Sequence, residues 1–201
     1  MKKGSVDILL PSALGVLGCI ALAFWLTAGR ALNLEPRLPG KDGVPDSAGA
    51  ADVLPPEPTG VVRLDGQPSS LPGSWPWFRG PAFNAIAQDG ASLARQWPTE
   101  GPKVLWNVEL GPGHAGAAVD GGRVFVLDYD PVALADTMRC FSLDDGREIW
   151  RNSYPVEVVE NHGMSRTVPA VSGSFVVSFG PKCHVACWNV ETGDCLWLID
   201  L

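Results

Sequence analysis

Basic residues are scarce in this sequence. Its 201 residues include 15 Lys and Arg against 22 Asp and Glu, which gives a formal net charge of −7. Most of the deficit falls in residues 75–201, which hold 9 basic and 15 acidic residues. An acidic surface repels phosphate backbones, so this composition argues against nucleic acid as a partner.

The motifs of common catalytic sites are also absent. The chain has no G-x-S-x-G nucleophile turn, no phosphate-binding loop ending in G-K-[ST] and no H-E-x-x-H. It holds only 3 His. We therefore predict no catalytic residue, and the sequence leaves open whether the protein is an enzyme.

Metal binding is not predicted either. Cys183, His184 and Cys187 look like ligands, but on one strand the two cysteines would lie about 13 Å apart, too far for one tetrahedral ion or a disulfide. Small buried side chains on packed strands explain them better. Residues 128–131 and the pair Asp144-Asp145 offer too few oxygens for calcium, and they suit turns.

Only one long run carries no charge, from Ile8 to Leu26 after Lys2 and Lys3. As a helix its nineteen residues would be about 28 Å long, close to a hydrocarbon core of about 30 Å, with Pro11 in the first turn. We predict that residues 1–29 form a transmembrane anchor. Since positive flanks stay inside, the chain would be single-pass in the inner membrane with its C-terminal part periplasmic or extracytoplasmic.

Two alternatives place the rest of the chain on the same side. One is a cleaved signal peptide, although Arg30 spoils the small-residue cleavage site. The other is a lipoprotein with Cys19 lipidated, because residues 16–19 read V-L-G-C; against it, the sequence stays apolar past Cys19.

Residues 30–74 show no helical or strand periodicity and contain eight prolines. Such a segment buries too little apolar surface to offset its ordering entropy, so we interpret it as a disordered linker. A short strand at residues 61–64 is the one structured alternative within it.

The C-terminal part repeats itself. Residues 140–150 (C-F-S-L-D-D-G-R-E-I-W) match residues 187–197 (C-W-N-V-E-T-G-D-C-L-W) at an offset of 47, and residues 118–125 match residues 170–177 at an offset of 52. The first copy therefore has five extra residues within Asp128–Arg139, and Trp106 marks the tail of an earlier copy. Periods of 40–50 residues with several short strands indicate propeller blades.

Each copy predicts four strands joined by tight turns. Asp145-Gly146 suggests a type I′ hairpin, and centring the turns there and on Thr192-Gly193 would pair Phe141 with Trp150 and Trp188 with Trp197. The expected strands lie near residues 116–120, 123–128, 138–144 and 147–152, then 167–171, 174–179, 183–190 and 195–200. The predicted fold class is all-β: a partial propeller of about two to three four-stranded blades over residues 75–201.

This pattern resembles the repeat of pyrroloquinoline-quinone-type (PQQ-like) propellers. That superfamily includes quinoprotein dehydrogenases and the propeller lipoprotein of outer-membrane assembly. Residues 75–81 (W-P-W-F-R-G-P) resemble the W-x-x-F-R-G-P opening of extracytoplasmic members. No cofactor is evident from the residues, and PQQ is implied only by the resemblance; the vicinal Cys-Cys pair that its quinone enzymes often carry is missing here.

Two copies and a fragment are too few to close a propeller, which needs about 4–8 blades. We expect either a truncated gene product, which we favour, or an oligomer or second chain that completes the propeller.

The candidate ligand-binding residues are basic. His114 and Arg166 each precede the first strand of a copy by four residues, which would bring them to the mouth of the central channel. His162 and Lys182 complete the set. The alternative is that such side chains bond only neighbouring loop groups.

The leading functional hypothesis is a membrane-tethered binding or scaffold module with a protein or polysaccharide partner. The alternatives are a fragment of a quinoprotein-type oxidoreductase and an envelope protein-assembly factor, which would bind partners by β-strand addition.

Overall fold

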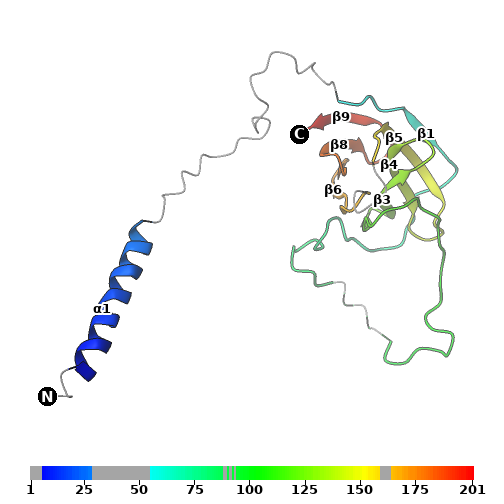
Figure 1. The fold of residues 1–201 in the computed structure, drawn as a ribbon. Helices are drawn as coiled ribbons and strands as arrows, with labels where there is room; N and C mark the ends of the chain where they lie inside the picture. Colours follow the sequence, from blue (N-terminus) through cyan, green and yellow to red (C-terminus); the bar gives the residue numbers. More distant parts are fainter. Residues whose placement is uncertain (1–5, 29–54, 88–89, 91, 93, 159–163) are drawn as a thin grey trace, which may run out of the picture. The chain divides into compact units, whose positions relative to one another are not determined.

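The computed structural model describes residues 6–28, 55–87, 90, 92, 94–158 and 164–201. The chain divides into two units, residues 1–45 and 46–201. In the first unit, helix α1 spans Val6–Thr27 (Figure 1), which confirms a helix over the uncharged run. The helix begins before that run, so Pro11 lies inside it rather than in its first turn.

Within the described residues, no helix is both long and apolar enough to cross a membrane. The prediction of a transmembrane anchor is therefore not supported.

Five strands of the second unit form one antiparallel sheet (Figure 1). Strands β2 (Ala118–Asp120), β3 (Arg123–Asp130), β4 (Ala135–Ser142) and β5 (Glu148–Pro155) follow one another as a meander. Strand β1 (Val61–Arg63) adds to the outer side of β5, so the order is β1-β5-β4-β3-β2. We call β2–β5 the first blade.

A second sheet repeats this meander with strands in the order β6-β7-β8-β9. Its strands are β6 (Ala170–Ser172), β7 (Phe175–Phe179), β8 (His184–Asn189) and β9 (Cys195–Asp200), and we call them the second blade. The two blades confirm the predicted pair of four-stranded copies and their approximate strand limits.

The five extra residues of the first copy lengthen one hairpin. From Arg123 to its partner Ser142 the chain runs 20 residues, and from Phe175 to its partner Asn189 it runs 15. The surplus extends β3 and β4, which stay paired as far as Asp130 and Ala135.

The predicted register of the last two strands is wrong by one residue in both blades. Trp150 pairs with Cys140, and Phe141 pairs with Glu148, because a β-bulge lies between Cys140 and Phe141. The bulge puts the two aromatic rings on opposite faces of the blade. In the second blade Trp197 pairs with Cys187 and Trp188 with Cys195, again across a bulge.

The turn before β5 explains this shift. Gly146 has a positive φ of +69°, but Asp145 is not among the residues with positive φ, so the turn is not type I′. Instead, the Gly146 N–H donates to the Ser142 carbonyl (3.1 Å) and the Ser142 N–H to the Arg147 carbonyl (2.8 Å). This closes a four-residue loop, and Asn189, Gly193 and Asp194 repeat it.

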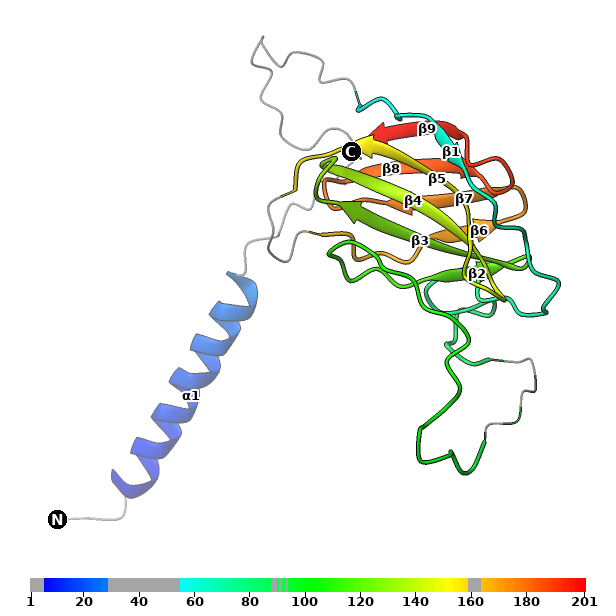
Figure 2. The same ribbon diagram turned by 90° about the vertical axis from the view of Figure 1, so that its right-hand side faces the viewer.

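The main core lies between the two blades, which pack face to face (Figure 2). Its buried side chains come from both sheets and include Phe125, Leu127, Tyr129, Met138, Trp150, Tyr154, Val171, Val176, Ala186 and Trp188. A smaller cluster of Val124, Val126 and Phe141 covers the other face of the first blade, with Trp106 and Val108 against it.

One tryptophan contact occurs twice. The Trp150 indole N–H donates to the Val190 carbonyl (3.0 Å), and its ring lies against Gly193. The Trp106 indole N–H donates to the Leu143 carbonyl (2.9 Å), and its ring lies against Gly146. The repetition supports the interpretation of Trp106 as the tail of an earlier copy.

Part of the predicted linker belongs to the sheet. Residues 59–76, which we call the strap, run along the outer edge of β5 and then reach the edges of β2 and β6. The bonds along the strap are Thr59 N–H to Ser153 O (2.7 Å), Leu64 N–H to Ile149 O (2.9 Å), Ser69 N–H to Gly122 O (2.9 Å), Trp75 N–H to Val119 O (2.7 Å) and Val171 N–H to Pro76 O (2.8 Å). Strand β1 confirms the short strand considered at residues 61–64. The rest of the strap was missed, because backbone bonds to strand edges need no side-chain periodicity; residues 30–54 lie outside the described residues.

The W-P-W-F-R-G-P segment makes a compact series of turns after the strap. The Trp75 ring lies against Gly80, and the Trp77 ring stacks on Phe83 with centroids 4.9 Å apart. Gly80 takes a positive φ of +71°, which leaves no room for a side chain beside that ring.

Candidate functional site

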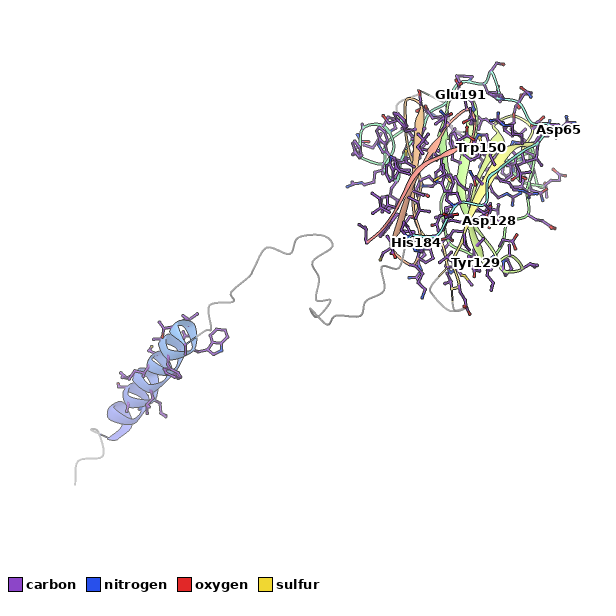
Figure 3. The ribbon with its side chains drawn as sticks, turned by 90° about the horizontal axis from the view of Figure 1, so that it is seen from above. Asp65, Asp128, Tyr129, Trp150, His184 and Glu191 are labelled. Atoms are coloured by element: carbon purple, nitrogen blue, oxygen red, sulfur yellow. The ribbon has the colours of Figure 1, made fainter. Side chains whose placement is uncertain are left out.

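The turns and connections that precede or follow several strands meet at one end of the two blades. This loop end carries the β3–β4 turn (residues 131–134), the β7–β8 turn (residues 180–183) and the segments that lead into β2 and β6. Figure 3 shows Tyr129 and His184 toward this end and Glu191 toward the opposite one.

A buried polar cluster joins the blades near the loop end. The Asp136 carboxylate on β4, which is fully buried, accepts hydrogen bonds from the Tyr154 hydroxyl on β5 (3.0 Å) and the Ser165 hydroxyl (2.8 Å). The His184 ring of the second blade lies edge-on to the Tyr154 ring, with centroids 5.3 Å apart. The cluster thus connects three strands and the segment before β6.

Burial controls the protonation of this cluster. Loss of hydration raises the pKa of Asp136, although the bonds from Ser165 and Tyr154 and the nearby His184 act in the opposite direction. Burial also raises the pKa of Tyr154, and the neighbouring Asp136 charge adds to this effect. Tyr154 therefore stays a neutral donor.

His184 is buried but incompletely bonded. Its Nδ1 has no hydrogen-bond partner among the described residues, and its Nε2 lies 3.7 Å from Asp200 Oδ1. The side chain is about nine-tenths buried. This geometry suits a ring held in place by packing more than a nucleophile or an activating base.

Beside the cluster is a cavity of about 280 Å³. Its lining comes from two segments, the one before β6 and the β7–β8 turn: Met164, Arg166, Thr167, Phe179, Gly180, Pro181 and Cys183. The Thr167 hydroxyl donates to the Phe179 carbonyl (2.6 Å), which ties the two segments together.

Three of the four predicted ligand-binding residues lie at the loop end. The His114 N–H donates to the Ser165 carbonyl (2.8 Å), so the segments before β2 and β6 are neighbours and His114 lies close to Arg166 in the chain fold. Lys182 belongs to the β7–β8 turn and lines a separate cavity with His184. His162 lies outside the described residues. As ligand-binding residues, all four stay predictions.

Acidic residues that had suggested calcium serve other purposes. Asp128 Oδ2 accepts from Arg139 (3.0 Å), which also makes a two-pronged bond to Glu148 (2.8 and 3.1 Å). Burial alone would lower the pKa of Arg139, but its bonds to Glu148 and Asp128 raise it overall. Asp130 Oδ1 accepts from two turn amides (2.9 Å each). Among the described residues, no group of His, Cys, Asp or Glu could hold a metal ion.

The five cysteines are free thiols. Burial raises the pKa of Cys140 to about 12 and that of Cys195 to about 11. Cys183 is exposed in the β7–β8 turn rather than on one strand with Cys187, and it has a positive φ of +68°. Apart from Cys19, which is exposed on helix α1, these thiols belong to the core and to one turn.

The two blades differ at their outer edges. The outer strand of the first blade, β5, is paired with β1, whereas β9 is the last strand of its sheet among the described residues. Leu196, Trp197 and Ile199 of β9 are each more than 40 % exposed. An unpaired strand edge is a template for another strand.

Comparison with known proteins supports the fold. A family model described as "Outer membrane protein assembly factor BamB" matches residues 86–201, more than half of the chain. The chain belongs to this PQQ-like repeat family. A comparison with curated proteins gives no match.

Two solved structures resemble this PQQ-like repeat protein. BamB from Moraxella catarrhalis is 21% identical, with a TM-score of 0.40, over 52% of this chain and 30% of that one. Europium-containing methanol dehydrogenase is 21% identical, with a TM-score of 0.33, over 42% of this chain and 15% of that one. This chain therefore spans less than a third of either structure's length.

Sequence reasoning missed most of the polar cluster in this PQQ-like repeat. Asp136 falls in the five-residue insertion of the first copy, so the second copy has no counterpart to draw attention to it. Tyr154 and Ser165 lie at the end of one strand and in the segment before another. The one available signal was Asp136 itself, an acidic residue just before a predicted strand, which could have indicated a buried polar group.

Proposed function

We propose that this chain is a protein-binding scaffold of the cell envelope that holds partners by β-strand addition. The family description, an outer-membrane protein assembly factor, supports the more specific role of assisting the assembly of envelope proteins. Both roles need a surface that accepts an extended segment.

The observation that carries the proposal is the contrast between β5 and β9. The strap already shows how a blade edge accepts an added strand: Val61, Val62 and Arg63 pair antiparallel with Asn152, Arg151 and Trp150. Strand β9 has the same place in its blade, with the bulge repeated at the same position, and it lacks such a partner among the described residues. Backbone bonds to β9 would supply affinity with little demand on the partner's sequence.

The side chains of β9 favour an apolar partner. Trp197 and Ile199 lie on one face of β9 and are 43% and 47% exposed, so an added strand with apolar residues at alternate positions would pack beside them. Strands of that kind need protection until they find their final sheet.

The proposal includes the location of the module. The charge-free run from Ile8 to Leu26 after two lysines favours an N-terminal segment that holds the chain at the inner membrane with its blades outside the cytoplasm. Alkaline phosphatase fused after Leu201 should be active in cells; an inactive fusion would contradict this location.

Crosslinking tests the binding role. A photoreactive phenylalanine at Leu196 should capture newly made envelope proteins, whereas the same residue at Val132, which is 92% exposed on the β3–β4 turn, should not. With the photoreactive residue placed instead at Ile199, which is 47% exposed on the same strand, Leu196→Pro removes one backbone donor at the bulge of an edge strand, where proline is tolerated, and should reduce capture. Leu196→Ala keeps the donor and should retain it. Equal capture from Leu196 and Val132, or by the Pro and Ala variants, would contradict strand addition.

A further inference from the structure

We propose that the cavity between the segment before β6 and the β7–β8 turn binds a small apolar molecule that carries one carboxylate. This site is separate from the β9 edge and does not depend on strand addition. Its support comes from charge, lining and rigidity.

Arg166 supplies the charge. It is the one ionisable group with a permanent charge among the seven lining residues, and no acidic side chain is among them. Arg166 is exposed, and no described residue makes a hydrogen bond or ion pair with its guanidinium. A guanidinium presents paired N–H groups that match the two oxygens of a carboxylate, so an anion of that shape fits it best.

The remaining lining is mostly apolar. Met164, Phe179 and Pro181 offer hydrocarbon and thioether surface, and Thr167 already uses its hydroxyl to bond Phe179. The cavity of about 280 Å³ is slightly smaller than most ligand pockets, which are typically about 300–1,000 Å³. A compact acid with one ring or a short chain fits this space better than a polyol or a nucleotide.

The buried cluster holds both walls in place. Ser165, between Met164 and Arg166, donates to Asp136 Oδ1. On the other wall Gly180 lies so close to the same group that an added Cβ would be 2.7 Å from Asp136 Oδ2 and would also overlap the Tyr154 hydroxyl. One carboxylate thus fixes both segments, so the cavity exists before a ligand arrives and little ordering entropy is lost on binding.

Binding of 3-phenylpropionate to the full chain tests the proposal. Titration followed by the Gly180 amide and the Met164 methyl signals in NMR should show saturable shifts, and the neutral 3-phenylpropanamide should bind about tenfold more weakly or worse. Arg166→Gln should weaken the affinity for the acid by about 10–100-fold and leave the affinity for the amide unchanged. Arg166→Lys should restore only part of the affinity lost in Arg166→Gln, because the charge remains but the paired N–H groups are gone.

Arg79→Gln is the matched control, since Arg79 is also an exposed arginine but does not line the cavity. It should leave the affinity for the acid unchanged. Absence of saturable shifts, equal binding of acid and amide, or an equal loss in Arg79→Gln would each overturn the proposal. None of these results bears on capture at the β9 edge, so the two ideas fail separately.

Discussion

Gly193 lies at a close contact between the two blades. It has a positive φ of +75°, and an added Cβ would be 2.6 Å from Cδ2 of the Trp150 ring. Any side chain therefore meets both backbone strain and overlap. The same is true of Gly146 beneath Trp106. The tryptophan of one copy thus packs on the turn glycine of the next copy. This contact explains why both residues recur in the repeat pattern.

Replacing Gly193 with Ala should destabilise the fold more than an open glycine does. We expect Gly193→Ala to lose about 2–4 kcal/mol of unfolding free energy, from strain plus overlap. Gly173→Ala is the control, because Gly173 also has a positive φ (+57°) but no atom within 4 Å of its Cβ position; it should lose about 1–2 kcal/mol. Urea unfolding followed by tryptophan fluorescence measures both, and equal losses would contradict the contact.

Asp136 should make stability depend on pH in an unusual direction for a carboxylate. Burial raises its pKa in the folded chain above the ordinary value of 3.8. The folded state then holds the proton more tightly than the unfolded state, so the contribution of Asp136 is full below the unfolded pKa and is lost as pH rises through the folded pKa.

Asp136→Asn removes this titration and keeps an acceptor oxygen for one of the two donors, Ser165 or Tyr154; the loss of the other bond does not depend on pH in this range. The unfolding free energy of the wild type minus that of the variant should fall as pH rises from about 4 to 7, by about 1.4 kcal/mol for each unit of pKa difference. The difference isolates Asp136 together with its coupling to His184. Urea titrations at several pH values measure it, and a difference that is flat or rises with pH would show that burial does not dominate.

At the scale of elements, strand positions followed from the sequence but the register did not. The offsets of 47 and 52 placed all eight blade strands, since alternation and turn residues repeat between the copies. The bulges at Cys140 and Cys187 depend on the bonds that close the turns around Gly146 and Gly193, and composition does not distinguish these turns from two-residue ones. A slip of one residue moved Phe141 to the opposite face.

Apart from the short strand considered at residues 61–64, the strap escaped prediction for a different reason. Its bonds join backbone groups of residues 59–76 to strands that follow much later in the chain. Such pairing needs an open edge and a chain able to reach it, and neither is visible in a local window of sequence. The polar cluster is similar: His184 was considered only as a metal ligand, and its neighbours Tyr154 and Asp200 come from other strands.

Gly66 offers a way to release the strap without touching the blades. Its N–H donates to the Glu148 carbonyl (3.0 Å), and an added Cβ would lie 2.6 Å from the Arg147 carbonyl oxygen. Gly66→Ala should therefore push the strap off β5 and speed hydrogen exchange at the Leu64 amide, with β3 and β4 still protected. Gln67→Ala, an exposed neighbour, is the control. Unchanged exchange at Leu64 in Gly66→Ala would mean that the strap tolerates the overlap.

At the scale of the whole molecule, the outer face of the second blade resembles the face of the first blade that packs against the second. Phe125, Cys140 and Trp150 of the first blade face the main core. The repeat offsets map them to Val177, Cys187 and Trp197 of the second blade. On this outer face Trp197 and Phe179 are 43% and 42% exposed. An apolar surface of this kind marks an interaction site, here for a further blade or another copy of the chain.

We expect the chain to associate with itself through this face. Sedimentation of the 201-residue chain should show an average mass that rises with concentration, and Trp197→Glu combined with Phe179→Glu should lower it, because buried charges without partners oppose association. Val132→Glu, on the exposed β3–β4 turn, should leave the mass unchanged. Helix α1 is the same in all three proteins, so a difference between them reports on the blade. If the double variant and the Val132 variant associate equally, then self-association comes from elsewhere in the chain, and the outer face of the second blade is not the surface through which the repeat continues.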